Sequence, residues 1–475
     1  MKRISVLFFI VITFFLTAGL VYGAAEGAYP KEIKIGISTA MSGGWAGFGA
    51  KPAGGFKAAI DHINALGGIK NLGGAKLVGI IGDDEATPAK ALTAVERLIN
   101  IDKVVATIGV WPTQTPTAAQ SERNQTPCID ALGIAETWNR GYRYVFKNYS
   151  RGIDEATQEF EVMKEQCELN GVPFPKTAYM VYISDDCSTS SAAGFRTLAK
   201  EYGVKILGDE VVAVGQTTYG PILDRVAKAK PEMFFACMYT PGASVMYREI
   251  MERKMYFPYG IMSWGGGIED IQFYETTPPA AWAYAWAQEN GDQLPWKRPW
   301  YDYINETFKK HTGFAWTDSH PAIVYSSVWQ LKDALERVEW SSDLATFRNN
   351  LKDAIAETNI TLETGEKIAI PGTDQTFVPA IQPFGWKFLK YDEYGVTIDK
   401  PGNMSMNLGG VRWTLYPKWS RKLDPEGPKM VTLPLPGWEK RMNWPKLATT
   451  TEELERRIKI AKDHPEWGEW GMAGK

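Results

Sequence analysis

Short apolar runs alternate with stretches of helical periodicity along two separate parts of the chain. In the first part, from Ile33 to about Val145, apolar residues between the runs recur three and four positions apart. One helix is expected from Phe56, after a glycine-rich turn at 42–49, and is expected to stop at Gly67 and Gly68. The predicted strands are 33–37, 77–81 and 104–110, with a fourth from 127, and the second predicted helix is 88–99.

The second part, after Asn148, repeats this alternation. Predicted helices cover 153–169, 191–202, 222–229 and 244–253, and predicted strands cover 178–183, 210–214, 233–238 and 259–262. Strands that alternate with helices predict parallel sheets covered by helices on both faces. The chain is therefore predicted to be α/β with two such sheets, and ligands bind such sheets beyond the carboxyl ends of the strands. Two sheets facing each other across a hinge would form a closing cleft.

The regular alternation of strands and helices ends at about Pro278, where prolines interrupt a segment rich in Trp and Tyr. Two further helices are expected, at 322–338 and 344–357. After Pro417 the chain is rich in Pro, Trp, Lys and Glu, with helical periodicity at 452–461. We expect residues 418–475 to form a tail that wraps the outside of a lobe.

The first residues are typical of a secretory signal. Lys2 and Arg3 precede an almost entirely apolar run, and small residues follow at Gly23 and Ala25. We expect cleavage after one of these two residues, which makes 1–23 a signal peptide; the alternative is a retained membrane anchor. No Cys lies near the cut, so a lipid anchor is not expected, and no other segment is long and apolar enough to span a membrane.

The amino-acid composition further limits which class of protein this chain can be. A chain of 475 residues with 44% apolar and 23% charged residues is expected to be globular, with two domains and additional segments. Its 52 Lys and Arg against 55 Asp and Glu are not clustered as a nucleic-acid surface requires. Four cysteines lack any C-x-x-C pair, so they are either two disulfides of an exported protein or buried thiols: Cys128, Cys167, Cys187 and Cys237.

Catalytic and metal-binding motifs are missing from the sequence. Its four histidines include no H-E-x-x-H pair, and His62 is expected on the solvent side of its helix. There is no G-x-S-x-G elbow. Asp83, Asp84 and Asp130 end predicted strands, where acids more often close turns than catalyse. The chain is therefore predicted not to be an enzyme and to need no cofactor or metal.

Five ordered segments resemble the periplasmic solute-binding proteins of branched-chain amino acid ABC transporters. Each is weak alone, but together they follow the family order behind a signal peptide. They are Ile33–Ile37 with Met41–Gly44, Ala58–Ile69, Asp83–Pro88, Val105–Gly109 and Arg140–Phe146.

The resemblance implies a two-lobed fold with the ligand cleft at the hinge. It places 30–147 plus 277–355 in lobe 1 and 148–276 plus 356–417 in lobe 2. It also implies a periplasmic location and one partner complex, a membrane permease with cytoplasmic ATPases. The chain itself has no G-x-x-x-x-G-K-[ST] loop and would not hydrolyse ATP.

The resemblance also implies which residues line the cleft. Thr113 falls where the family offers a hydroxyl to the ligand carboxylate, and it could equally cap the following helix. Leu132 and Gly133 fall in the next ligand segment, where the family's threonine is missing. In the second lobe the corresponding positions are Asp186, Ser188, Tyr239 and Trp264.

Three departures from the family pattern change the expected ligand. The threonine is missing, an aromatic is absent near Cys187, and Trp264 stands where an acid would pair with the ligand ammonium. An unpaired buried ammonium is very costly. Trp45, Trp111, Tyr239 and Trp264 would instead form an aromatic cavity for a flat or bulky apolar compound, or a quaternary ammonium.

We therefore expect an aromatic or bulky apolar ligand that carries a carboxylate. Two alternatives stay open. One is a branched-chain or other amino acid, with Asp130 or Asp186 supplying the missing charge, and the other is a ligand-sensing receptor domain.

Overall fold

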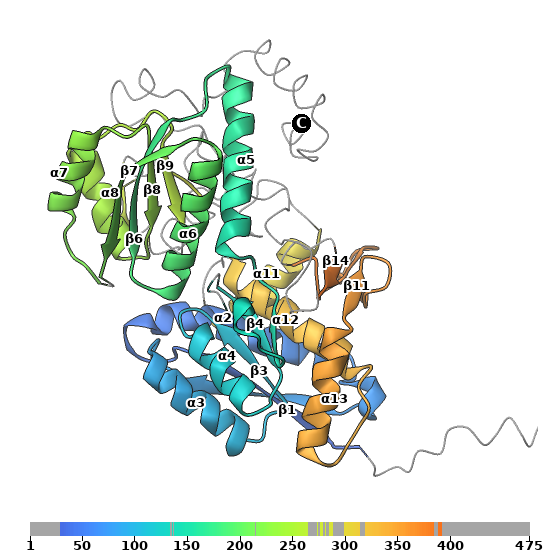
Figure 1. The fold of residues 1–475 in the computed structure, drawn as a ribbon. Coiled ribbons are helices and arrows are strands. Elements are labelled where there is room, and N and C mark those ends of the chain that lie inside the picture. The colour runs from blue at the N-terminus through green and yellow to red at the C-terminus, as the bar shows by residue number, and fades with distance from the viewer. Residues whose placement is uncertain are drawn as a thin grey trace, which may run out of the picture.

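A computed structural model describes residues 29–391, with the exceptions given at the end of this paragraph. The predicted signal peptide and the predicted tail at 418–475 lie outside the described residues. Two five-stranded parallel sheets form separate lobes, as the alternation predicts (Figure 1). The exceptions are residues 134, 136 and 214 and the segments 265–272, 274–275, 279–280, 282–284, 288–298, 314–318 and 384–387.

Lobe 1 is built on a sheet with strand order β2-β1-β3-β4-β5. Helices α3 and α4 pack together on one face, and α2 packs with a later helix on the other (Figure 1). This sandwich buries β3 and β4 completely, so most of their residues are apolar, with Thr107 and Asp130 as buried polar exceptions. The strands are β1 Glu32–Thr39, β2 Lys76–Asp83, β3 Ala106–Val110, β4 Cys128–Leu132 and β5 Val145–Lys147, and the helices are α2 Ala46–Ala65, α3 Pro88–Asn100 and α4 Gln114–Arg123.

Helix α2 starts ten residues earlier than the apolar periodicity predicts. The expected turn at 42–49 is a short 3-10 helix at Gly43–Trp45 followed by the first turn of α2. Glycine permits this approach, since a Cβ on Gly49 would lie 1.8 Å from the Ala40 carbonyl oxygen. Close backbone packing, rather than a turn, explains this part of the glycine-rich sequence.

Lobe 2 repeats the design with strand order β10-β9-β8-β6-β7. Helices α5 and α6 pack on each other beside one face of the sheet, while α7 and α8 lie on the other (Figure 1). The strands are β6 Thr177–Ile183, β7 Lys205–Val212, β8 Met233–Cys237, β9 Ile261–Trp264 and β10 Ala285–Ala287, and the helices are α5 Gly152–Asn170, α6 Asp186–Glu201, α7 Gly220–Ala229 and α8 Gly242–Glu252.

Two boundaries in lobe 2 differ from the prediction. Helix α6 starts five residues early because the Asp185 carboxylate accepts the Ser188 N–H and caps it. Strand β7 starts at Lys205 rather than 210 because it is the sheet edge, where only one residue in eight is buried. Caps and edge pairing define these ends, and neither leaves an apolar period in the sequence.

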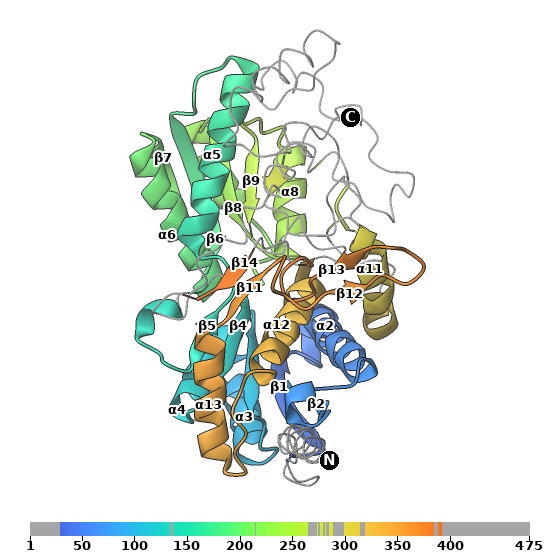
Figure 2. The same ribbon diagram turned by 90° about the vertical axis from the view of Figure 1, so that its right-hand side faces the viewer.

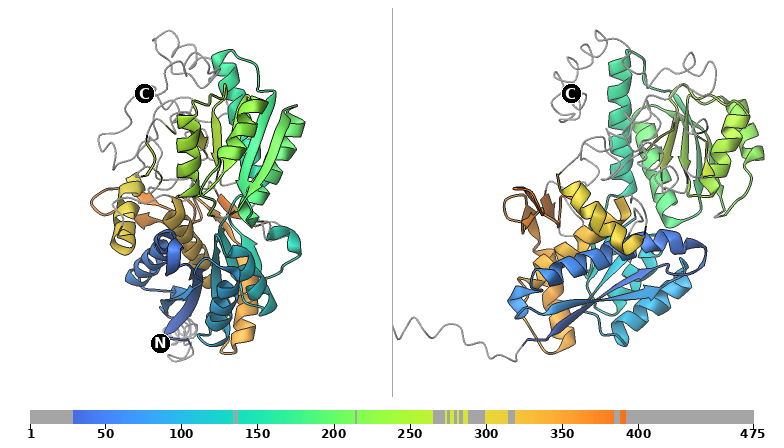
Figure 3. Two further views of the ribbon diagram at one scale, coloured as in Figure 1. Left: turned by 90° about the vertical axis from the view of Figure 1, so that its left-hand side faces the viewer. Right: turned by 180° about the vertical axis from the view of Figure 1, so that it is seen from behind.

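The last described elements return to lobe 1 and to the junction between the lobes. Helix α12 packs against α2 and β4, and α11 also packs against α2 (Figures 2 and 3). Two small antiparallel sheets, β11 with β14 and β12 with β13, lie beside the junction (Figure 2). The elements are α11 Pro299–Thr312, α12 Ser319–Leu335, α13 Leu344–Ala356, β11 Asn359–Thr361, β12 Ile368–Ala369, β13 Thr376–Phe377 and β14 Phe388–Lys390.

All four cysteines are buried and none forms a disulfide, which resolves the two alternatives that the sequence leaves open. Burial raises the pKa of Cys128 and of Cys167 to about 12. Cys128 and Cys167 therefore act as small apolar side chains of the lobe interiors, whereas Cys187 lies at the junction between the lobes.

His62 is half-buried and hydrogen-bonded to later helices of lobe 1, so it is less exposed than expected. Its Nδ1 lies 2.7 Å from the Tyr325 hydroxyl, and its Nε2 lies 3.3 Å from the Tyr303 hydroxyl. Burial lowers the pKa of His62, and the charge of Glu366 opposes this effect. The unfolded chain therefore binds a proton at pH values where the folded chain does not.

We expect this difference to destabilise the fold in acid. The contribution of His62 is complete above pH 6.5 and is lost as pH falls from 6.5 through the lower folded-state pKa. Urea unfolding of wild type and His62→Gln at several pH values would measure it. Over this window the stability of wild type should fall more steeply than that of the variant, by at most about 1.4 kcal/mol per pH unit. Parallel curves would contradict the prediction.

Candidate ligand-binding site

Aromatic side chains from both lobes meet between the two sheets. Trp111 follows β3 of lobe 1 and Tyr239 follows β8 of lobe 2, and their ring centroids lie 4.2 Å apart. Trp45 lies edge-on to both rings, at 5.1 Å from Trp111 and 6.2 Å from Tyr239, and Phe48 packs on Trp111 at 4.7 Å. We call Trp45, Phe48, Trp111 and Tyr239 the aromatic cluster. Three of these residues were expected in the cleft, and Phe48 was missed because it lies in the segment predicted as a turn.

Polar groups of lobe 2 surround Tyr239. Its hydroxyl donates to Asp185 Oδ1 at 3.3 Å, and Ser188 Oγ lies 3.3 Å from the same hydroxyl. Burial raises the pKa of Asp185. Asp186, the acid named from the sequence, is the exposed first residue of α6. The acid at the junction is therefore its neighbour, and the helix cap in front of Ser188 is the sequence signal that identifies it.

Thr113 lies where expected, but a protein carboxylate takes its hydroxyl. Thr113 Oγ1 donates to Asp84 Oδ2 at 2.5 Å, and the side chain makes no capping bond to α4. Asp84 Oδ2 also accepts from Ser38 Oγ at 2.9 Å. Burial raises the pKa of Asp84, and the hydrogen bonds from these two hydroxyls oppose this effect by stabilising the charged carboxylate. The capping interpretation of Thr113 is wrong.

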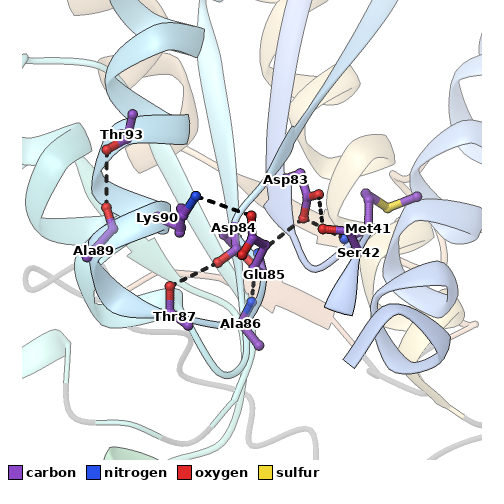
Figure 4. A network of polar contacts seen from close by, with 10 residues as sticks. All are labelled: Met41, Ser42, Asp83, Asp84, Glu85, Ala86, Thr87, Ala89, Lys90 and Thr93. Atoms are coloured by element: carbon purple, nitrogen blue, oxygen red, sulfur yellow. Dashed lines mark hydrogen bonds and ion pairs between the residues drawn. The ribbon is translucent and has the colours of Figure 1, made fainter. Parts of the chain in front are cut away.

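The acids after β2 hold turns, as such acids usually do. Asp83 accepts the Met41 N–H at 2.9 Å and the Ser42 hydroxyl at 2.6 Å, and it thereby ties the loop after β1 to the end of β2 (Figure 4). Asp84 Oδ1 accepts the Ala86 N–H in the next turn (Figure 4). These bonds fix the loops that carry Trp45 and contact Thr113.

Leu132 and Gly133 border the same turn. The backbone N–H of Trp111 donates to the Leu132 carbonyl at 2.6 Å, which joins the ends of β3 and β4. Gly133 has φ +123°, and a Cβ there would lie 1.6 Å from Gln114 Oε1 and 3.1 Å from Trp111 Cβ. Gln114 is buried and accepts from the Cys187 thiol of lobe 2 at 3.8 Å. Sequence reasoning missed Gln114, whose only signal is its place at a helix start beside Thr113.

We expect Gly133→Ala to destabilise lobe 1 and to displace Gln114. The cost combines backbone strain with the clash and should be about 1–3 kcal/mol. Gly141→Ala is the matched control, because Gly141 also has positive φ but no atom lies within 4 Å of an added Cβ. Urea unfolding should show the larger loss at Gly133. Equal losses would mean that the contact with Gln114 does not matter.

Trp264 ends β9 and is buried in lobe 2. Its ring packs on Phe235 at 5.4 Å, and its register partner in β8 is Cys237, two residues before Tyr239. Its indole Nε1 is buried and has no hydrogen-bond partner among the described residues. Trp264 thus lies at the carboxyl end of its strand without a ring contact to the aromatic cluster.

A buried ion pair lies behind the loop after β4. Lys147 Nζ lies 3.2 Å from Asp130 Oδ2 and donates to the Gly133 carbonyl at 2.7 Å, and Thr137 also donates to Asp130. Burial raises the pKa of Asp130, and the charge of Lys147 opposes this effect. Asp130 is therefore already paired within the protein, and Lys147 fixes the loop that begins at Gly133.

Metal clusters and membrane-spanning helices are both absent from the described residues. Within them, no group of three or more His, Cys, Asp or Glu side chains could hold a metal ion. No helix of the described part is long and apolar enough to cross a membrane.

Comparisons with known proteins place this architecture. The family model of the periplasmic binding proteins matches residues 32–377. The chain is 23% identical over 342 residues to the Leu/Ile/Val/Thr-binding protein of Salmonella typhimurium, which covers 70% of this chain and 86% of the relative. It is 22% identical over 331 residues to the Leu/Ile/Val-binding protein of Citrobacter freundii, which covers 67% and 83%. Both relatives are named as binding proteins.

Solved structures share the fold. A branched-chain amino acid transporter substrate-binding protein from Streptococcus pneumoniae, in complex with isoleucine, aligns with a TM-score of 0.61 at 17% identity and covers 78% of this chain and 97% of its own. A solute-binding protein of an ABC transporter from R. palustris, in complex with benzoate, aligns with a TM-score of 0.57 at 16% identity and covers 78% and 91%. The two-lobed fold expected from the resemblance is confirmed. The chain belongs to the periplasmic binding protein family, of the branched-chain amino acid type.

Proposed function

We propose that this protein is the periplasmic solute-binding component of an ABC importer and captures a small aromatic or bulky apolar carboxylate. The aromatic cluster is the observation that carries this proposal. It joins loops after β1 and β3 of lobe 1 to a loop after β8 of lobe 2, where ligands of parallel sheets bind. A ligand held there is contacted by both lobes, so binding favours their closed arrangement.

The chemistry of the cluster supports a flat apolar ligand body. Indole and phenol rings offer large rigid faces, and stacking on them adds to apolar burial. Leu132 contributes further apolar surface at the end of β4. Trp264 and Ser188 complete the proposed site from lobe 2. The fold neighbour from R. palustris is in complex with benzoate, which supports an aromatic carboxylate as the ligand.

Export and delivery follow from the same proposal. The apolar start with small residues at Gly23 and Ala25 supports secretion into the periplasm and removal of residues 1–23. The partner complex is then a membrane permease with cytoplasmic ATPases, as in the family.

One observation favours an amino acid as the second candidate. Asp185 is a carboxylate at the junction beside Tyr239, whereas Asp130 is paired with Lys147 and Asp186 is exposed. An ammonium group bound next to Asp185 would gain a counter-charge. This candidate predicts tight binding of leucine or a related amino acid, which the first candidate does not.

Native mass spectrometry of protein freshly purified from the periplasm tests the proposal. We expect the mature chain to retain a small molecule whose mass and fragments identify a carboxylate with an apolar body. Adding that compound to protein stripped by unfolding and refolding should shrink the particle in small-angle scattering. Retention of an amino acid would support the second candidate, and tight binding without any change in size would contradict closure.

A further inference from the structure

The turn between β3 and α4 carries three buried hydrogen-bonding atoms that have no partner among the residues the structure describes. They are Trp111 Nε1, Gln114 Nε2 and Thr115 Oγ1. The Trp111 side chain is 8% exposed and Gln114 is 1% exposed. Buried polar atoms are nearly always paired in folded proteins, because water cannot reach the unpaired ones. Three such atoms within five residues therefore point to a binding partner outside the described residues, such as a ligand.

This turn faces the second lobe. Trp111 packs on Tyr239, and Gln114 accepts from the Cys187 thiol at the start of α6. Gly133 lets the Gln114 side chain lie against the backbone, so its amide is held in place. The Gln114 side chain uses its carbonyl oxygen to accept from Cys187. Its N–H₂ group is then the donor without a partner among the described residues. The free groups therefore lie beside the aromatic cluster.

Thr113 cannot supply this donor function itself. A hydroxyl has one proton, and that of Thr113 is used by Asp84 at 2.5 Å. The donors that remain on the turn are the indole N–H and the amide of its neighbours. The start of α4 also adds positive potential at the same place, because the helix dipole has its positive end there.

We infer that the Gln114 amide and the Trp111 indole N–H bind the oxygen atoms of the ligand carboxylate, and that Thr113 is a positioning residue behind them. The inference rests on the proposed function and specifies its anion site. Asp84 orients Thr113, Gly133 makes room for Gln114, and the indole offers its face to the apolar body and its edge to the anion. The ligand class is a planar apolar compound with one oxyanion.

Calorimetry with matched acid and amide pairs tests the inference. The probes are benzoate, phenylacetate and 4-hydroxybenzoate with their primary amides, on ligand-stripped wild type, Gln114→Leu and Trp111→Phe. Each variant should bind the carboxylates about 10–100-fold more weakly than wild type, because hydrogen bonds to charged groups are the strong ones. The loss of affinity for the neutral amide probes should be several times smaller. Gln120→Leu, the same change six residues later in α4, should leave the affinities for acids and amides unchanged.

The outcomes separate the anion site from the proposed function. If wild type binds a carboxylate and both variants stay within about threefold of it, the inference fails and the proposed function stands. The same holds if acid and amide weaken equally. If wild type binds none of these carboxylates but binds leucine or a quaternary amine tightly, the proposed ligand class fails and the inference with it. Trp111→Phe keeps the test decisive should Gln114→Leu not fold.

Discussion

Replacing Lys147 with methionine is expected to destabilise the protein by about 3–5 kcal/mol, the cost of removing one partner of a buried ion pair. Lys147 is 1% and Asp130 is 0% exposed, and their charged atoms lie 3.2 Å apart. Methionine keeps the length of the side chain but leaves the Asp130 carboxylate without its cation. It also removes the donor to the Gly133 carbonyl. Urea unfolding measured at neutral pH gives the change in free energy.

A double variant provides the control. Asp130→Leu together with Lys147→Met replaces both charges with apolar groups, so it should be more stable than Lys147→Met alone. A loss below about 1 kcal/mol for Lys147→Met would show that the pair is unimportant. A double variant no better than the single one would mean that the bond to Gly133, and not the charge pair, matters most.

Trp111→Ala is expected to weaken binding of the true ligand by about 2–4 kcal/mol, which is roughly 30–1000-fold. Trp111 contacts Trp45, Phe48 and Tyr239, so its removal opens the centre of the aromatic cluster. It also removes an indole N–H proposed to bind the ligand. Calorimetry with the compound identified by mass spectrometry measures the change.

Two other tryptophans calibrate this effect. Trp340 packs on Phe347 outside the aromatic cluster, so Trp340→Ala should lower stability without changing affinity. Trp264→Ala should lower the affinity for the ligand if Trp264 lines the site as proposed. An unchanged affinity would place Trp264 in the core of lobe 2. A Trp111→Ala protein that still binds at wild-type strength would place the ligand elsewhere.

The alternation of apolar runs and helical periods was enough to predict the fold. Two doubly covered parallel sheets leave largely apolar strands, and these are visible at β3, β6 and β8. Element ends were less predictable because caps and close backbone contacts define them. The carboxylate of Asp185 starts α6, and Gly49 lets α2 begin against β1.

The candidate site was predictable only as far as loop positions go. Strand ends place Trp111, Thr113, Gly133 and Tyr239 near the junction, because parallel strands end at one edge. Which atoms remain available for a ligand depends on pairings between distant residues. The Thr113 bond to Asp84 spans 29 positions and that of Cys187 to Gln114 spans 73. No local pattern in a single sequence reports such pairs.

His62 shows the same limit within lobe 1. It lies on a helix whose local period suggested an exposed side chain, but Tyr303 and Tyr325 cover it from more than 240 residues further along the chain. Local periodicity describes one helix face at a time. It does not show which later helix will pack on the other face, as α11 and α12 do here.

Calorimetry of ligand-stripped mature protein against leucine and a panel of aromatic carboxylates tests the central claim most directly. Losing one charged contact to the ligand ammonium costs about 2–5 kcal/mol, or at least tens-fold in affinity. The account predicts that an aromatic or bulky apolar carboxylate binds at least tens of times more tightly than leucine. Sub-micromolar binding of leucine, with weaker binding of every carboxylate in the panel, would contradict it.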